Sequence, residues 1–247
     1  MPPTIRGYPR LSSLFLLALL SAGCANAAAA APAPPKDRLG IARPIAPESP
    51  PMPKLPPIAQ TGDLVLRARA EEVPAEKIRE KAFRDLVSTM ITVMRKAPGV
   101  GLAAPQIGVG LRVIVLEDRE ELIRKLSDDE RQERKREAFP TRVFVNPILT
   151  RIGDEKAIFF EGCLSVHGYV GLVERHLEVE VTGLDEEGVP QTWRVRGWPA
   201  RILQHEVDHI DGTLYIDRMR SRSFSTQEHA KALYSGKPIG EVLRIVP

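Results

Sequence analysis

The stretch His205-Glu206-Val207-Asp208-His209 decides how this chain is interpreted. Residues 200–210 are predicted to form a helix, on which side chains four positions apart lie on one face. The imidazoles of His205 and His209 can therefore hold one metal ion, and the carboxylate of Glu206 can reach a water molecule on that ion. The pattern predicts a metal-dependent hydrolase, although a helix with two surface histidines would carry the same letters.

A catalytic metal needs a third protein ligand and a position left open for water. One class of zinc protease has a histidine six residues after the second, where this chain has Tyr215, which argues against that class. Another class uses a glutamate further along the chain, and Glu228 can serve. Cys163 is the better ligand, because a thiolate with two imidazoles suits a soft or borderline divalent metal. Taken alone, a free cysteine is most simply a small buried hydrophobe.

A second informative stretch runs from Gly99 to Gly108, with the sequence Gly-Val-Gly-Leu-Ala-Ala-Pro-Gln-Ile-Gly. Its glycines and alanines allow the backbone to approach a ligand closely. Pro105 stiffens the segment that presents Gln106, and a rigidly held amide is a good donor to a developing oxyanion. An ordinary tight loop between a helix and a strand would have the same composition.

Around these stretches, hydrophobic periodicity predicts alternating helices and strands. A helix is predicted over 74–96, with Ile78, Ala82, Leu86, Met90 and Val93 on its buried face. The charged residues 118–137 are interpreted as an exposed helix or excursion, most simply a solvated surface. Strands are predicted at 111–116, 142–149, 157–166 and 177–182, with 191–196 as a hairpin partner across a turn at 185–188.

Composition indicates one well-formed core and excludes some partners. The chain has 247 residues, 43% of them hydrophobic, and a formal net charge of +3. Positive and negative residues are interleaved, so we expect no direct nucleic-acid partner. The two cysteines, Cys24 and Cys163, are each interpreted alone and not as a disulfide framework.

Residues 1–27 resemble a targeting signal: two arginines, an apolar run and then small residues. The apolar run is too short to span a bilayer as a helix, so no transmembrane span is expected. Cleavage in front of Cys24 would leave a lipid anchor at that residue. The segment favours a place in the cell envelope or outside the cell. An organelle, or a cytoplasmic protein whose translation starts at Met52, are the alternatives.

Residues 28–57 are rich in alanine and proline, and ten of the chain's 22 prolines fall between Pro32 and Pro57. Such a stretch favours extended polyproline geometry and does not form a core. We therefore expect a linker over 28–57 and a folded domain over 58–247, interrupted by the charged excursion at 118–137.

Three motifs in this order resemble the peptide deformylase family, in its organellar-type or bacterial type 1 branch. They are the Gly-x-Gly-x-Ala-Ala-Pro-Gln stretch at 99–106, Glu-Gly-Cys-x-Ser at 161–165 and His-Glu-x-Asp-His at 205–209. The resemblance runs from about Ile58 to about Met219. It implies an α+β fold in which antiparallel or mixed β-sheets are wrapped around a central helix that carries the His-Glu-x-x-His motif.

The resemblance also implies roles for individual residues. Cys163, His205 and His209 would bind the metal, typically ferrous iron (Fe2+), with Zn2+, Ni2+ or Co2+ as substitutes. Glu206 would act as general base and then general acid, while Gln106 and the backbone amide of Leu164 would form the oxyanion hole. Residues that would contact the substrate are Gly101, along its backbone, and Val100, Trp198 and Ile202, around the methionine side chain.

The implied reaction removes the N-formyl group from the N-terminal methionine of newly made polypeptides and releases formate. Formyl-methionyl peptides or nascent chains, and with them the ribosome, would be the partners. Two alternatives stay open: a zinc endopeptidase with Glu228 as third ligand, and a non-catalytic binding protein on the same fold. His167 is interpreted as a loop histidine, Asp208 as a structural or ligand-orienting residue, and Arg201 as contacting either the peptide or a carboxylate.

Overall fold

The computed structural model describes residues 55–246. The signal-like segment 1–27, with Cys24, lies outside the described residues. So do Met52 and positions 28–54 of the expected linker. Within the described part, no helix has both the length and the apolar character needed to cross a membrane.

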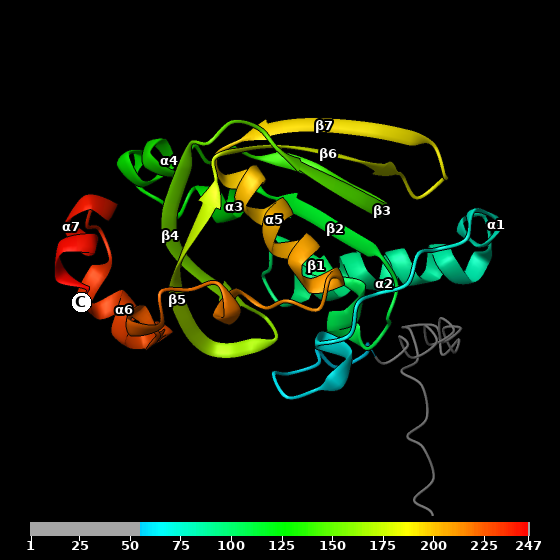
Figure 1. Ribbon diagram of the computed structural model, residues 1–247, viewed down its shortest axis with the longest axis horizontal. Helices are drawn as coiled ribbons and strands as arrows, with labels where there is room; N and C mark the ends of the chain where they lie inside the picture. The colour runs from blue at the N-terminus through cyan, green and yellow to red at the C-terminus, as the bar shows by residue number, and fades with distance from the viewer. Residues whose placement is uncertain (1–54, 247) are drawn as a thin grey trace, which may run out of the picture. The chain divides into compact units, whose positions relative to one another are not determined.

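Two antiparallel sheets form the framework (Figure 1). The five-stranded sheet has the order β1-β2-β3-β6-β7 and the three-stranded sheet the order β4-β5-β8. The strands are β1 (Gly101–Ala103), β2 (Val113–Asp118), β3 (Phe139–Arg151), β4 (Lys156–Cys163), β5 (Val166–His176), β6 (Glu178–Leu184), β7 (Pro190–Arg196) and β8 (Ser225–Thr226). The expected α+β class is confirmed.

Helix α5 (Trp198–Ile210) lies between the sheets and contacts strands of both (Figure 1). It begins after Gly197, whose φ of 80° and close approach to Lys135 exclude a side chain. It ends before Gly212, which has a φ of 75°. The range of α5 confirms the predicted helix over 200–210. Because most of its residues are buried, α5 is the central helix of the fold.

The predicted helix over 74–96 is wrong in one respect, because it is two helices, α1 (Ala75–Ile78) and α2 (Lys81–Lys96). Glu80 is extended, with φ −73° and ψ 149°, and interrupts the helical path. Met90 and Val93 of the predicted face are buried, and Leu86 is half-buried, but Ala82 is exposed while Phe83 and Val87 are buried.

The predicted strand over 157–166 is also wrong, because the chain reverses within it. Strands β4 and β5 form a hairpin in which Cys163 pairs with Val166, and Leu164 and Ser165 make the turn. A run of apolar residues looks continuous in the sequence whether or not it folds back. The hairpin places Cys163 at the tip of the three-stranded sheet.

The charged residues 118–137 contain two short helices, α3 (Glu120–Ile123) and α4 (Asp128–Arg134). Both ends of this excursion are anchored. Asp118 is buried and accepts hydrogen bonds from Nε and Nη2 of Arg136 at 2.7 and 2.9 Å. Ile123 is fully buried as well, so the segment is more than a solvated surface.

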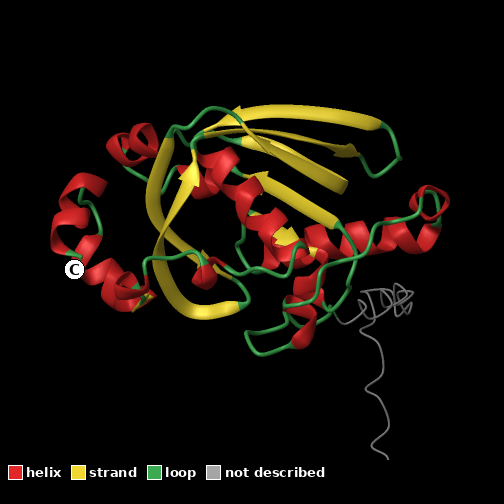
Figure 2. Ribbon diagram, in the orientation of Figure 1, coloured by secondary structure: helices red, strands yellow, loops and turns green. Residues whose placement is uncertain are grey.

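The remaining elements are short and were not predicted (Figure 2). They are the 3-10 helices η1 (Leu64–Leu66), η2 (Ala104–Ile107), η3 (Tyr215–Asp217) and η4 (Ser221–Ser223), and the helices α6 (Gln227–Tyr234) and α7 (Ile239–Ile245). One apolar cluster lies between α2 and the five-stranded sheet, and a second joins that sheet to α5. Helix α5 is thus held by packing along most of its length.

Candidate metal centre

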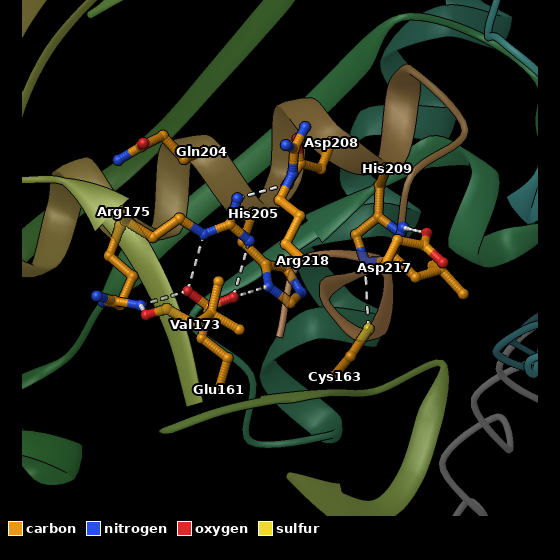
Figure 3. Close-up of polar contacts among 12 residues, drawn as sticks. Glu161, Cys163, Val173, Arg175, Gln204, His205, Asp208, His209, Asp217 and Arg218 are labelled. Carbon is orange, nitrogen blue, oxygen red and sulfur yellow. Dashed lines mark hydrogen bonds and ion pairs between the residues drawn. The ribbon is translucent and has the colours of Figure 1, made fainter. Parts of the chain in front are cut away.

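The ligand atoms of Cys163, His205 and His209 all lie within 4.8 Å of one another. Sγ of Cys163 is 3.1 Å from Nε2 of His209 (Figure 3). Both imidazoles come from α5 and the sulfur from the β4–β5 hairpin, so a cysteine converges on one point with histidines 42 and 46 positions further along the chain. This is a three-ligand arrangement of the kind that leaves a position open on a metal.

Nδ1 of His205 lies 3.0 Å from Oε2 of Glu161. This contact leaves Nε2 of His205 for a metal and fixes the tautomer of the ring. Burial alone would lower the pKa of His205, but hydrogen bonds to Cys163 and Glu161 raise it well above its ordinary value. Metal binding needs the neutral ring, so binding of an ion would compete with protonation of His205.

Glu161 is the centre of a buried charge network (Figure 3). It accepts hydrogen bonds from Nε and Nη2 of Arg175 at 2.9 and 2.8 Å, and from Nη1 of Arg201 at 2.5 Å. Burial would raise the pKa of Glu161, but Arg175 and His205 hold it well below its usual range. The carboxylate therefore stays ionised beside the histidine.

A second carboxylate, Asp208, extends this network along the same helix. It accepts from Nη1 of Arg175 at 2.5 Å and from Nε and Nη2 of Arg218, both at 2.7 Å. Asp208 thus holds arginines rather than a ligand ring, which confirms the structural interpretation of this residue. Arg201 likewise contacts the carboxylate of Glu161, one of the two contacts expected for it.

Glu206 is buried, and its Oε2 has no hydrogen-bond partner among the described residues. A Cβ atom on Gly101 would lie 2.2 Å from Oε1 of Glu206, so a side chain at position 101 would displace this carboxylate. Burial raises the pKa of Glu206 to about 7. A carboxylate with an unsatisfied oxygen and a near-neutral pKa is suited to accept and return a proton.

The side chain of Gln106 is fixed by its own loop. Its Oε1 accepts a hydrogen bond from the Ala103 amide at 2.8 Å, which turns Nε2 toward Cys163. Nε2 lies 3.6 Å from Sγ of Cys163 and 3.3 Å from Oγ of Ser165. Leu164 follows Cys163 in the hairpin turn, so both expected oxyanion donors lie beside the sulfur.

These groups face a cleft of about 760 Å³. Nine of the ten sequence-predicted site residues line it, and His209 lies just behind the others. The nine are Val100, Gly101, Gln106, Cys163, Leu164, Trp198, Ile202, His205 and Glu206. Arg136, from the charged excursion, also lines the cleft, with its guanidinium 4.9 Å from the centre of the Trp198 ring.

The family model described as polypeptide deformylase matches residues 55–225. The chain belongs to this family. It is 50% identical over 175 residues to peptide deformylase 1A, chloroplastic, of Solanum lycopersicum, covering 71% of this chain and 63% of that protein. It is 42% identical over 176 residues to the mitochondrial peptide deformylase of Homo sapiens, covering 71% and 72%. This chain therefore spans less than two thirds of the tomato protein.

Solved deformylase structures have the same fold. A crystal structure of class I type b peptide deformylase from Acinetobacter baumannii with bound Met-Ala-Ser has a TM-score of 0.60 and 32% identity. It covers 68% of this chain and 100% of that chain. Helices α6 and α7, from Gln227 onward, lie beyond the region that the family model matches.

Glu228 is exposed on α6 and is not part of the group of converging ligand atoms, which argues against it as third ligand. His167 is exposed at the cleft and is likewise outside the group, but it lies in strand β5, so its interpretation as a loop histidine is wrong.

Several residues at this site could not be given a role from the sequence. Glu161 was quoted within a motif, but its contact with His205 was not foreseen, nor were its partner Arg175 and the cleft residue Arg136. Gln60 was missed as well, although it lines the cleft. A buried carboxylate such as that of Glu161 needs a cationic partner. This requirement could have indicated that an arginine lies beside it, as Arg175 does.

Proposed function

We propose that this chain is a metal-dependent peptide deformylase, which hydrolyses the formamide of N-terminal formyl-methionine and releases formate. The observation that carries the proposal is the convergence of one sulfur and two imidazole nitrogens within 4.8 Å. Next to them lies the buried Glu206 carboxylate with its unpaired oxygen. Membership in the polypeptide deformylase family supports the choice of reaction.

The donor set of Cys163, His205 and His209 fits a divalent ion. A thiolate and two imidazoles suit iron, zinc, nickel or cobalt, and Glu161 supplies the oriented outer contact that such ligands usually have. We propose Fe2+ as the native ion, with Zn2+, Ni2+ or Co2+ as substitutes. When bound, the ion supplies Lewis-acid activation of a water molecule and of the formyl carbonyl group.

The side chains then divide the proton and charge movements. Glu206 accepts a proton as the water oxygen attacks the formyl carbon, and later gives it to the amine nitrogen as the carbon–nitrogen bond breaks. Nε2 of Gln106 and the backbone N–H of Leu164 donate to the formyl oxygen as it gains negative charge. One such donor contributes about 3–4 kcal/mol to stabilisation of the transition state. The products are formate and a free amino terminus.

The cleft walls position the peptide. Gly101 has no side chain, so the substrate backbone can run close to Glu206. Val100, Trp198 and Ile202 are the proposed surroundings of the methionine side chain. The Acinetobacter relative was crystallised with the tripeptide Met-Ala-Ser, a deformylated product, which supports a peptide ligand for this cleft.

The decisive experiment measures formate release from formyl-Met-Ala-Ser by the reduced, iron-loaded protein, with and without a chelator. We expect release that the chelator abolishes and added Fe2+ restores. Cys163→Ala should lose the metal, whereas Glu228→Ala should keep both metal and activity. The opposite pattern would support the zinc endopeptidase. No release by the iron-loaded protein would refute the enzyme and leave the non-catalytic binding protein.

We also keep the proposed organisation of the whole chain: a signal-like segment at 1–27, a linker at 28–57 and the deformylase domain at 58–247. Export is the proposed destination, with a lipid anchor at Cys24 as a possible product of cleavage. The names of the tomato and human relatives favour an organelle instead. Amino-terminal sequencing of the native protein separates these outcomes, and a chain that starts at Met52 would refute export. Nascent chains on the ribosome are the proposed physiological substrate.

A further inference from the structure

The first residues of the domain cross the two loops that carry the proposed oxyanion donors. The amide of Ala59 donates to the carbonyl of Gln106 at 2.8 Å. The next two residues, Gln60 and Thr61, turn to the β4–β5 hairpin instead. Since η2 follows β1 of the five-stranded sheet and the hairpin belongs to the three-stranded sheet, residues 59–61 connect the two sheets at the cleft.

Gln60 and Thr61 hold the hairpin turn at successive points. Nε2 of Gln60 donates to the Leu164 carbonyl at 3.0 Å, and Oε1 of Gln60 accepts from the His167 amide at 3.4 Å. The amide and hydroxyl of Thr61 both donate to the Ser165 carbonyl, at 2.8 and 2.9 Å. These contacts restrain the turn whose first peptide N–H, that of Leu164, is a proposed donor.

The two segments that carry the proposed oxyanion donors also contact each other directly, but these contacts are made by the reactive groups themselves. Nε2 of Gln106 contacts Sγ of Cys163 and Oγ of Ser165. These contacts must change when Nε2 turns to a substrate oxygen. The hydrogen bonds of residues 59–61 involve no atom of the proposed chemistry, so they can persist throughout the reaction. They are therefore the restraint that keeps the two donors at a fixed separation.

We propose that Gln60 is a positioning residue of this enzyme, which with Ala59 and Thr61 sets the distance between the Gln106 and Leu164 donors. The inference rests on the proposed deformylase function and deepens it. Gln60 itself lines the cleft but acts through the Leu164 turn. Because the donors act on charge that develops only in the transition state, loss of the restraint should lower kcat more than it changes KM.

The test compares Gln60→Ala with Gln191→Ala in the iron-loaded enzyme. Gln191 is the matched control, because its Nε2 also donates to a main-chain carbonyl, that of Val143 at 2.6 Å, but it lies on β7 and does not line the cleft. We expect Gln60→Ala to lower kcat for formyl-Met-Ala-Ser about 10-fold, a part of the 100-fold or greater loss that removal of a whole donor causes, with KM changed less than about twofold. Gln191→Ala should keep the wild-type kcat.

A second measurement does not depend on activity. Amide hydrogen exchange of the peptide spanning 163–167 should become faster in Gln60→Ala and stay unchanged in Gln191→Ala. Equal kcat in the two variants, or a loss in Gln60→Ala that lies in KM alone, would overturn the positioning role. Unchanged exchange at 163–167 would overturn the restraint itself. An inactive wild type would instead refute the deformylase function, while the exchange experiment would still decide whether Gln60 restrains the turn.

Discussion

The carboxylate of Glu161 lies 3.0 Å from Nδ1 of His205 and is at the same time held by two buried arginines. One residue thus orients a metal ligand and pairs with Arg175 and Arg201, while Arg175 also pairs with Asp208. Removing the charge of Glu161 therefore affects both the metal ligand and the buried ion pairs.

Glu161→Gln should weaken metal binding about 10- to 100-fold, because the ring of His205 loses its oriented charged partner. The change also leaves Arg201 without a carboxylate partner, while Arg175 keeps Asp208, so the metal-free protein should lose about 3–5 kcal/mol of unfolding free energy. Metal content after dialysis and urea denaturation measure the two effects. Glu155→Gln, at an exposed ion pair with Arg196, is the control and should alter neither. Wild-type metal content in Glu161→Gln would contradict the orienting role.

Gly101→Ala should leave metal content intact and lower kcat about 100-fold, since a displacement of a catalytic group by about 1 Å has an effect of that size. The new Cβ would lie 2.2 Å from Oε1 of Glu206, so the carboxylate must move. Formate release and metal analysis provide the measurement. Gly110→Ala is matched, because nothing lies within 4 Å of its Cβ position. If both variants kept full activity, the placement of Glu206 against Gly101 would be irrelevant to catalysis.

Asp118→Asn should loosen the wall of the cleft. Asp118 is the buried partner of Arg136, whose guanidinium lies over the Trp198 ring. Loss of the charge leaves a buried arginine unpaired, and we expect a loss of about 3–5 kcal/mol in stability. KM for formyl-Met-Ala-Ser should rise more than kcat falls. Asp128→Asn, at an exposed position of α4, should change neither quantity. Equal melting temperatures for the two variants would show that the excursion is not anchored by this pair.

Protonation of Glu117 should make the metal-free protein less stable in acid. Hydrogen bonds from Arg95 lower the pKa of Glu117 below its ordinary value of 4.5. A lowered folded-state pKa stabilises the fold above the unfolded value, and this contribution disappears as the pH falls from about 4.5 through the folded value. Because Arg95 is half-exposed, the contribution should be about 1 kcal/mol.

Urea denaturation of metal-free wild type and Glu117→Gln at pH 7 and pH 3 tests this linkage. The gap between the two proteins should be present at pH 7 and shrink at pH 3. Glu174→Gln, at an exposed pair with Lys156, should not show the shrinking gap. A gap of the same size at both pH values would mean that the Glu117 charge does not contribute through Arg95.

Local sequence patterns predicted those parts of the fold in which one periodicity runs from cap to cap. The helix at 200–210 and the strands at 177–182 and 191–196 have clear signals, and they appear as α5, β6 and β7. The pattern failed where the chain bends within a stretch that was predicted to be one element. The extended Glu80 divides α1 from α2, and the turn at Leu164 and Ser165 divides β4 from β5. The backbone conformation at these positions causes the two breaks, and no residue type there marks them in the sequence.

The candidate site shows the same division. The likeness of three motifs to one family identified the residues that converge on the cleft. Contacts between distant segments were not visible in the sequence, because nothing in the spacing of Gln60 and Leu164, or of Glu161 and Arg175, links them. Such pairs depend on the tertiary arrangement of the two sheets around α5.

A shortage of the ion should affect the abundance of this protein as well as its turnover. Cys163 belongs to the hairpin and both histidines to α5, so a coordinated ion would cross-link two elements that are otherwise held by side-chain contacts. Binding to the native state alone raises unfolding free energy in proportion to the logarithm of ion concentration. Cells starved of the metal would then lose molecules to proteolysis, and a thermal melt would report metal loading without any substrate.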